Sequence, residues 1–162
     1  MLKVSFKDDF KKVQTFNSKA TVVNLTGTVK FPNELFRLIP LDLDEWIFHH
    51  PTVEVVDSVV RGWTLKASGT AKCADGDTFN PIVGERIAEA KAKIKLYKFM
   101  HTLLYKLYVY YFRFTFGDRY ALCNIDKTAD YKKPGGIFEE MGKYQALLIK
   151  ESHHLGKLLE ET

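Results

Sequence analysis

The chain has 162 residues, of which 46% are hydrophobic and 14% aromatic. This content is too apolar for an intrinsically disordered chain, and the length fits one domain, residues 1–162, with a sizeable core. The 24 basic and 20 acidic side chains leave a net charge of only +4, which does not by itself indicate nucleic-acid binding. A basic surface must therefore come from local clustering of lysines and arginines.

The two cysteines, Cys73 and Cys123, lie far apart and belong to no metal-binding spacing. We expect reduced thiols rather than a structural disulfide. The N-terminus lacks the long apolar run of a secretory signal peptide, because Lys7, Asp8 and Asp9 follow a very short apolar stretch. Together these features predict a cytoplasmic protein.

The first third of the chain carries strand patterns and short helical patterns. Leu2–Phe6 gives a weak strand signal, whereas Ala20–Phe31 alternates apolar and polar residues with the period of a strand that buries one face. Asn33 then stands where it can cap a short helix over Glu34–Ile39. A second short helix is predicted over Asp42–His49.

Two further strands are predicted before the middle of the chain. Thr52–Arg61 is rich in valine, and the side on which its apolar residues lie changes near Asp57, which indicates a β-bulge. Trp63–Cys73 shows the cleanest alternation in the sequence. The residues on its apolar face become smaller after Leu65, so we expect a bulky element, such as the following helix, to cover its far end.

A long helix is predicted from Asn80 to about Tyr108. Asn is a strong N-cap, and Pro81 occupies the first helical position, where the missing N–H costs nothing. Residues spaced three and four apart give this helix an apolar stripe. The stripe comprises Val83, Ile87, Ala90, Ile94, Tyr97, His101, Leu104 and Tyr108. A second apolar side comprises Leu96, Phe99, Leu103, Leu107 and Tyr110.

A narrow basic stripe lies between these two apolar sides of the helix. It comprises Lys91, Lys95, Lys98, Lys106 and, if the helix continues, Arg113. Lysines three or four residues apart stand on one helical face, so the stripe is able to contact a run of phosphates or an acidic partner. The alternative is that these lysines are simply solvated, as charged side chains usually are.

The last third of the chain begins with an ambiguous segment. Val109–Phe116 is β-branched and aromatic, which favours a strand continued by Arg119–Ile125; we favour the alternative, a helix that runs on to about Tyr111. A polar loop is predicted over Lys127–Gly136, followed by a second long helix over Ile137–Glu160. Its apolar stripe can pack on the first long helix or on a second copy of the chain. The stripe comprises Ile137, Met141, Tyr144, Leu148, Leu155 and Leu159.

These elements predict an α+β fold in which an antiparallel sheet from the N-terminal half packs on the long central helix, with the second long helix following. The hydrophobic run over Leu96–Phe116 does not indicate a membrane span. Lys98, His101, Lys106 and Arg113 interrupt it, and charges near the centre of a bilayer are expensive.

No catalytic or metal-binding motif emerges from the sequence. Asp75-Gly76-Asp77 resembles the start of a calcium loop, but the required Gly and Glu positions are occupied by Asn80 and Arg86. The neighbouring pairs His49-His50 and His153-His154 lack the i, i+4 spacing that holds zinc on a helix. His101, on the apolar side of the helix, is interpreted as a core histidine. We expect no cofactor and no metal.

One stretch resembles a pattern found in small bacteriophage proteins of unassigned function. In this pattern a strand ends at Ala71-Lys72-Cys73, an acidic-aromatic turn follows at Asp77-x-Phe79, and a helix opens with Gly84-x-x-Ile87-Ala88-x-Ala90-x-Ala92. The physical role of the small residues Gly84 and Ala88 would be to let the helix approach the strand closely, with Phe79 filling the corner. The resemblance implies a protein that acts by binding, either inhibiting a host defence complex or sequestering a signalling nucleotide.

The resulting hypothesis is a non-catalytic, phage-type protein that counters a bacterial defence system, such as a CRISPR or other immune complex, in the host cytoplasm. Its partner would be a host defence protein, a ribonucleoprotein or a phosphate-bearing ligand. The residues expected to bind it are Lys91, Lys95, Lys98, Lys106, Arg113 and Arg119. Two alternatives remain: a nucleic-acid-binding domain, or a small structural or assembly protein that dimerises through Ile137–Leu159.

Overall fold

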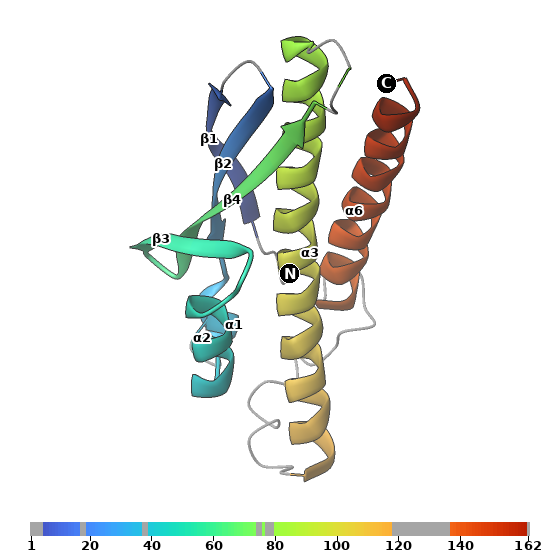
Figure 1. Cartoon of the computed structure of the whole chain (residues 1–162). Coiled ribbons are helices and arrows are strands. Elements are labelled where there is room, and N and C mark those ends of the chain that lie inside the picture. Colours follow the sequence, from blue (N-terminus) through green and yellow to red (C-terminus); the bar gives the residue numbers. More distant parts are fainter. Residues whose placement is uncertain are drawn as a thin grey trace.

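A computed structural model of the chain describes residues 5–16, 19–36, 39–73, 76, 80–117 and 137–161. It has an α+β fold, as the sequence predicted. Four strands form one antiparallel sheet in the order β1-β2-β4-β3, and the long helix α3 lies between this sheet and the C-terminal helix α6 (Figure 1). The layers therefore run from sheet to α3 to α6.

The two central strands confirm the alternation seen in the sequence. Strand β2 (Ala20–Lys30) pairs with β4 (Gly62–Lys72) along its whole length, from Ala20 opposite Lys72 to Lys30 opposite Gly62. Every second residue of both strands is buried on the face that α3 covers. The opposite face carries the polar residues of each strand, so the sheet has one apolar side and one polar side.

The two outer strands are shorter or less regular. Strand β3 (Val53–Val59) pairs with β4, and its register shifts between Val55 and Asp57, which confirms the predicted bulge. Strand β1 (Ser5–Phe16) pairs with β2 and has its own register shift between Asp8 and Phe10. The short helices are α1 (Asn33–Phe36) and α2 (Leu41–Phe48), and α2 is close to its predicted span. The predicted cap of α1 was wrong, because Asn33 is its first residue and the Leu35 and Phe36 amides donate to the Pro32 carbonyl.

The prediction for β1 was wrong in extent, because the sequence indicated a strand only to Phe6. The bulge displaces the alternation by one residue, and charged residues occupy the strand on both sides of it. One of these charged residues, Lys11, has its partners on α3. Its ammonium lies 2.7 Å from Glu85 Oε1 and 2.8 Å from Glu89 Oε2, so it links the outer strand to the first turns of α3.

Helix α3 (Pro81–Gly117) starts as predicted and ends later than predicted. Asn80 Oδ1 accepts hydrogen bonds from the backbone amides of Ile82 at 3.1 Å and Val83 at 3.3 Å, which confirms the N-cap. The strand alternative for Val109–Phe116 was wrong. Strand preference mainly reflects packing on a sheet, whereas an existing helix gains one hydrogen bond per added residue without a new nucleation step.

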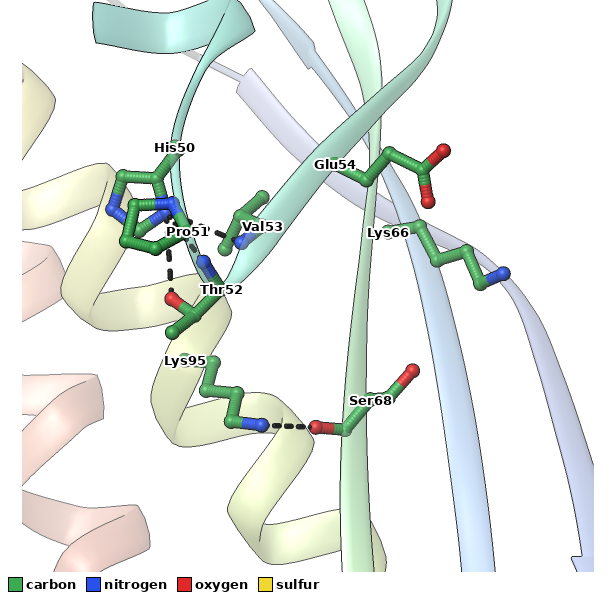
Figure 2. Close-up of a pocket in the computed structure, with 8 residues that line it drawn as sticks. All are labelled: His50, Pro51, Thr52, Val53, Glu54, Lys66, Ser68 and Lys95. Carbon is green, nitrogen blue, oxygen red and sulfur yellow. Dashed lines mark hydrogen bonds between the residues drawn. The ribbon is translucent and has the colours of Figure 1, made fainter.

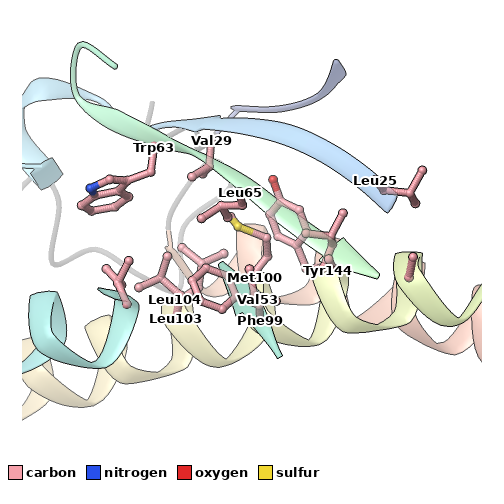
Figure 3. Close-up of a cluster of buried hydrophobic side chains, with 14 of the residues drawn as sticks. Leu25, Val29, Val53, Trp63, Leu65, Phe99, Met100, Leu103, Leu104 and Tyr144 are labelled. Atoms are coloured by element: carbon pink, nitrogen blue, oxygen red, sulfur yellow. The ribbon is translucent and has the colours of Figure 1, made fainter. Parts of the chain in front are cut away.

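The far end of β4 lies directly against α3, as its shrinking side chains predicted. A Cβ atom added to Gly69 would lie 1.8 Å from the carbonyl oxygen of Ala88 and 2.7 Å from the amide nitrogen of Ala92. The predicted role of Ala88 in close packing is therefore confirmed, whereas Phe79, predicted to fill the corner, lies outside the described residues. Beyond this contact the core widens, and larger side chains from the sheet meet α3 in the apolar cluster of Figure 3.

Helix α6 (Ile137–Glu160) has the predicted bounds and packs on α3. Ile137, Met141 and Tyr144 from its predicted stripe are buried, and Leu148 and Leu155 are half-buried. The prediction for Leu159 was wrong, because this residue is exposed and its neighbour Leu158 is buried instead. The stripe therefore packs on α3, one of the two partners predicted for it. Burial raises the pKa of the Tyr144 hydroxyl well above its ordinary value, with smaller contributions from Glu140 and Tyr97.

Candidate binding site at the open edge of strand β4

Strand β4 extends further than its neighbour β3. The pairing of β3 with β4 ends at Val53 opposite Ala67, whereas β4 continues to Lys72 in its pairing with β2. Within the described ranges, Ser68–Lys72 is therefore paired with a strand on one side only. We call this segment of β4 the open edge.

Two lysines of α3 reach across to the open edge. Lys95 Nζ donates a hydrogen bond to the Ser68 carbonyl at 2.6 Å, and Lys91 Nζ donates one to the Thr70 carbonyl at 3.0 Å. Both side chains are half-buried. Their spacing of four residues matches carbonyls two residues apart in a strand, because four helical residues rise about 6.0 Å and two strand residues about 6.6 Å. The ammonium groups thus donate where a neighbouring strand would otherwise donate.

A pocket of about 330 Å³ lies at the start of this edge, just before the first residue of β3 (Figure 2). Its walls come from the segment that leads into β3, from β4 and from α3. The lining residues are His50, Pro51, Thr52, Val53, Glu54, Lys66, Ser68 and Lys95. Glu54 and Lys66 stand opposite each other on paired strands and point away from His50 and Lys95 (Figure 2). The pocket therefore has Lys95 on one side and the cross-strand neighbours Glu54 and Lys66 on the other.

His50 fixes the turn that leads into β3. Its Nδ1 accepts hydrogen bonds from the backbone amides of Thr52 at 3.2 Å and Val53 at 3.1 Å (Figure 2). An imidazole nitrogen that accepts two N–H groups carries no proton, so the neutral ring with its proton on Nε2 fits this geometry. Burial lowers the pKa of His50, and the charge of Lys98 lowers it further.

An aromatic cluster supports the His50 ring from behind the pocket. Trp46 stacks on Phe99 with ring centroids 5.0 Å apart and an interplanar angle of 16°. His50 meets both rings edge-on, at 5.0 Å from Trp46 and 4.9 Å from Phe99. Lys106 Nζ lies 5.3 Å from the centroid of the Trp46 ring, within the range of a cation–π interaction.

The structure places the six predicted binding residues differently. Lys91 and Lys95 contact the open edge, Lys98 is exposed near His50, and Lys106 is exposed over Trp46. Arg113 belongs to α3, but its side chain is not among those described, and Arg119 lies outside the described residues.

Three functional candidates, His50, Lys66 and Lys72, were missed from the sequence. Lys66 and Lys72 belong to the polar face of β4, so their alternation with buried residues was the available signal. His50 gave no signal, because its role depends on the closed turn. His101 is half-buried rather than fully buried as predicted. Of the acidic turn before α3, both Asp75 and Asp77 lie outside the described residues.

Within the described part of the chain, no group of three or more His, Cys, Asp or Glu side chains is arranged to hold a metal ion. No helix in that same part is both long enough and apolar enough to cross a membrane. Comparisons of the chain with protein families, with curated proteins and with solved structures give no match. The resemblance to phage proteins therefore stays a prediction.

Proposed function

We propose that the chain is a non-catalytic binding protein that receives an anionic partner at the open edge of β4 and the adjoining pocket. The observation that carries this proposal is the clustering of lysines around one strand edge. Lys66 and Lys72 belong to β4, Lys91 and Lys95 reach the edge from α3, and Lys98 of the same helix lies near His50. Among the residues that line the pocket, Glu54 is the acidic one.

The biological setting that we propose is the countering of a bacterial defence system, and it rests on the sequence resemblance. Defence complexes carry phosphates in their guide RNA or in signalling nucleotides, and many proteins carry acidic surfaces. Each of these would be attracted by the lysine cluster, with a strength that falls as salt rises. The arrangement of charge thus supports the same kind of partner that the resemblance implies.

The test requires variants that remove charge without damaging the fold. Reversal at Lys91 or Lys95 is unsuitable, because a carboxylate would then face a strand carbonyl that now accepts a hydrogen bond. Lys66→Glu combined with Lys98→Glu avoids this problem, since neither lysine donates a hydrogen bond to a backbone carbonyl of the residues that the structure describes. Lys150→Glu, at an exposed position of α6, is the matched control.

Each variant is expressed in bacteria that carry one of a panel of CRISPR-type or nucleotide-signalling defences, and phage plating efficiency is measured. We expect the natural chain and Lys150→Glu to restore plating against at least one defence, and the double variant to lose this effect. If the natural chain restores plating against none of the panel, the anti-defence proposal is wrong. If the double variant is fully active, the lysine cluster is not the binding surface.

A nucleic-acid-binding function is the second candidate, and the polar face of the sheet favours it. Lys12 stands opposite Asn24, which stands opposite Ser68, so these residues share one face with Lys66. Helices α3 and α6 lie on the other side of the sheet (Figure 1). A gel-shift titration with single-stranded DNA at increasing salt tests this function, because binding through phosphates weakens steeply with salt. Absence of a shift at low salt would exclude it.

A further inference from the structure

The backbone of the open edge is able to accept another strand. Successive residues of a strand point their N–H and C=O groups toward opposite edges. The Cys73 amide donates to the Lys19 carbonyl at 2.7 Å, so odd-numbered residues at this end of β4 face β2. The even-numbered residues Ser68, Thr70 and Lys72 consequently face away from β2, which agrees with the lysine hydrogen bonds to two of their carbonyls.

The pocket provides room at the place where an added strand would begin. It lies immediately before Val53 and is bordered by Ser68 on β4 and Lys95 on α3 (Figure 2). A strand placed there would lie in line with β3 and pair with Ser68–Lys72. At about 3.3 Å per residue, this edge spans about 16 Å, which is enough for a short extended peptide.

The lysines near the open edge indicate which side chains an added strand should carry. Lys66 and Lys72 belong to the polar face of β4, and Lys91 and Lys95 approach from the face that α3 covers. The side chains of an added strand alternate between these two faces. Carboxylates at either set of positions would therefore meet lysines, which makes an acidic segment the matching ligand.

We propose that the open edge of β4 binds an extended acidic segment of a partner protein as an added strand in line with β3. This inference rests on the proposed binding function and specifies its mode and its partner. The backbone N–H groups of the segment replace the Lys91 and Lys95 ammonium groups at the Ser68 and Thr70 carbonyls. The displaced ammonium groups then pair with the segment's carboxylates, so the added strand both extends the sheet and is held by charge.

The experiment uses the full chain labelled with ¹⁵N and follows backbone amide shifts by NMR. The probe is a short peptide of glutamates, blocked at both ends, so that carboxylates lie on both faces of the added strand. We expect its addition to shift the amides of Ser68, Thr70 and Lys72 in a saturable way. The same peptide with an N-methyl group on every residue should bind about tenfold more weakly or worse, because it loses all the backbone donors that would face the open edge. A lysine peptide of the same length should not bind.

Two charge variants test whether the peptide binds at the open edge or elsewhere on the sheet. Lys66→Glu with Lys72→Glu should abolish peptide binding, whereas Lys12→Glu, which changes the same sheet face at β1, should leave it nearly unchanged. The inference is overturned if the peptide leaves the open-edge amides unmoved, or if the N-methylated peptide binds equally well. It is also overturned if those amides shift with protein concentration alone, which indicates a second copy, or only with single-stranded DNA.

The outcomes also distinguish this inference from the proposed function. If phage plating depends on Lys66 and Lys98 while the peptide leaves the open edge unmoved, the protein binds an anionic partner by another mode. If the peptide binds as expected but plating never changes, strand addition holds and the anti-defence setting is wrong.

Discussion

Gly69 of β4 lies so close to Ala88 of α3 that a Cβ atom on the glycine would be 1.8 Å from the alanine carbonyl oxygen. The obstacle is backbone, which cannot rotate away as a flexible side chain would. This contact brings α3 near enough to β4 for Lys91 and Lys95 to reach the strand carbonyls. Because Gly69 has no side chain, α3 lies close enough to β4 for Lys91 and Lys95 to bond to it.

Gly69→Ala should lower the free energy of unfolding by about 1–3 kcal/mol or more, since the helix must move off the sheet. Urea unfolding measures this change. Gly142→Ala is the control, because a Cβ at that exposed position of α6 meets nothing within 4 Å. It should raise stability by about 0.5–1 kcal/mol, since glycine is unfavourable inside a helix. An unchanged Gly69→Ala protein would contradict the close approach of α3 to β4.

Lys11 offers a second prediction, because it bridges β1 to Glu85 and Glu89 of α3. These hydrogen bonds, first to Glu85 and then to Glu89, raise the pKa of Lys11. The groups are partly exposed, so Lys11→Met should cost only a few tenths to about 1 kcal/mol at low salt and less at high salt. Lys12→Met, on the opposite face of the same strand, should change stability by less. A Lys11→Met effect independent of salt would show that the loss comes from packing rather than charge.

The strands and helices that follow one regular period could be predicted from the sequence alone. Residues of β4 alternate without interruption, and α6 keeps the predicted apolar stripe as far as Leu155, so a single pattern defines most of each element. Strand β1 fails this test because its bulge changes the alternation and because Lys11 is matched to acids that come more than 70 residues later. No local pattern carries that information.

The candidate site could be predicted only in part, for a related reason. The helical period shows that Lys91 and Lys95 share a face of α3, but it does not show that strand carbonyls lie opposite them. Those carbonyls lack a strand partner on that side because β3 starts at Val53, opposite Ala67, and does not extend along Ser68–Lys72. The sequence of β4 alone does not show where its neighbour stops. The role of His50 is equally hard to predict, because its Nδ1 meets the Val53 amide only when the turn has closed.

Asn80 gives a third prediction at the start of α3. Its side-chain oxygen accepts from the amides of Ile82 and Val83, which would otherwise lack helical partners. Asn80→Ala should therefore cost about 1 kcal/mol, whereas Asn80→Asp should keep most of the stability. Hydrogen exchange at Ile82 and Val83 should accelerate in the alanine variant. Asn33→Ala, at the exposed first residue of the short helix α1, is the control and should change stability by about 0.5 kcal/mol or less.

His50 gives the last prediction, which concerns pH. Burial and then the charge of Lys98 lower the pKa of His50 from its ordinary value of 6.5, so the folded chain binds fewer protons here than the unfolded chain. The stability that neutral His50 contributes is complete above about pH 6.5 and is lost as the pH falls through the folded-state pKa. Protonation also removes the acceptor for the Thr52 and Val53 amides, so the turn beside the pocket should open in the same pH range.

Urea unfolding between pH 7.5 and 5 measures this loss, and NMR titration of the imidazole gives the pKa directly. His50→Phe keeps a flat ring against Trp46 and Phe99 but removes the acceptor, so the variant should be less stable at neutral pH and should lack this component of the pH dependence. His49→Asn, at the exposed neighbouring position, should retain it. A His50 pKa at or above 6.5 would mean that the ring does not cap the turn as a neutral acceptor, and the pocket wall would then need another source of rigidity.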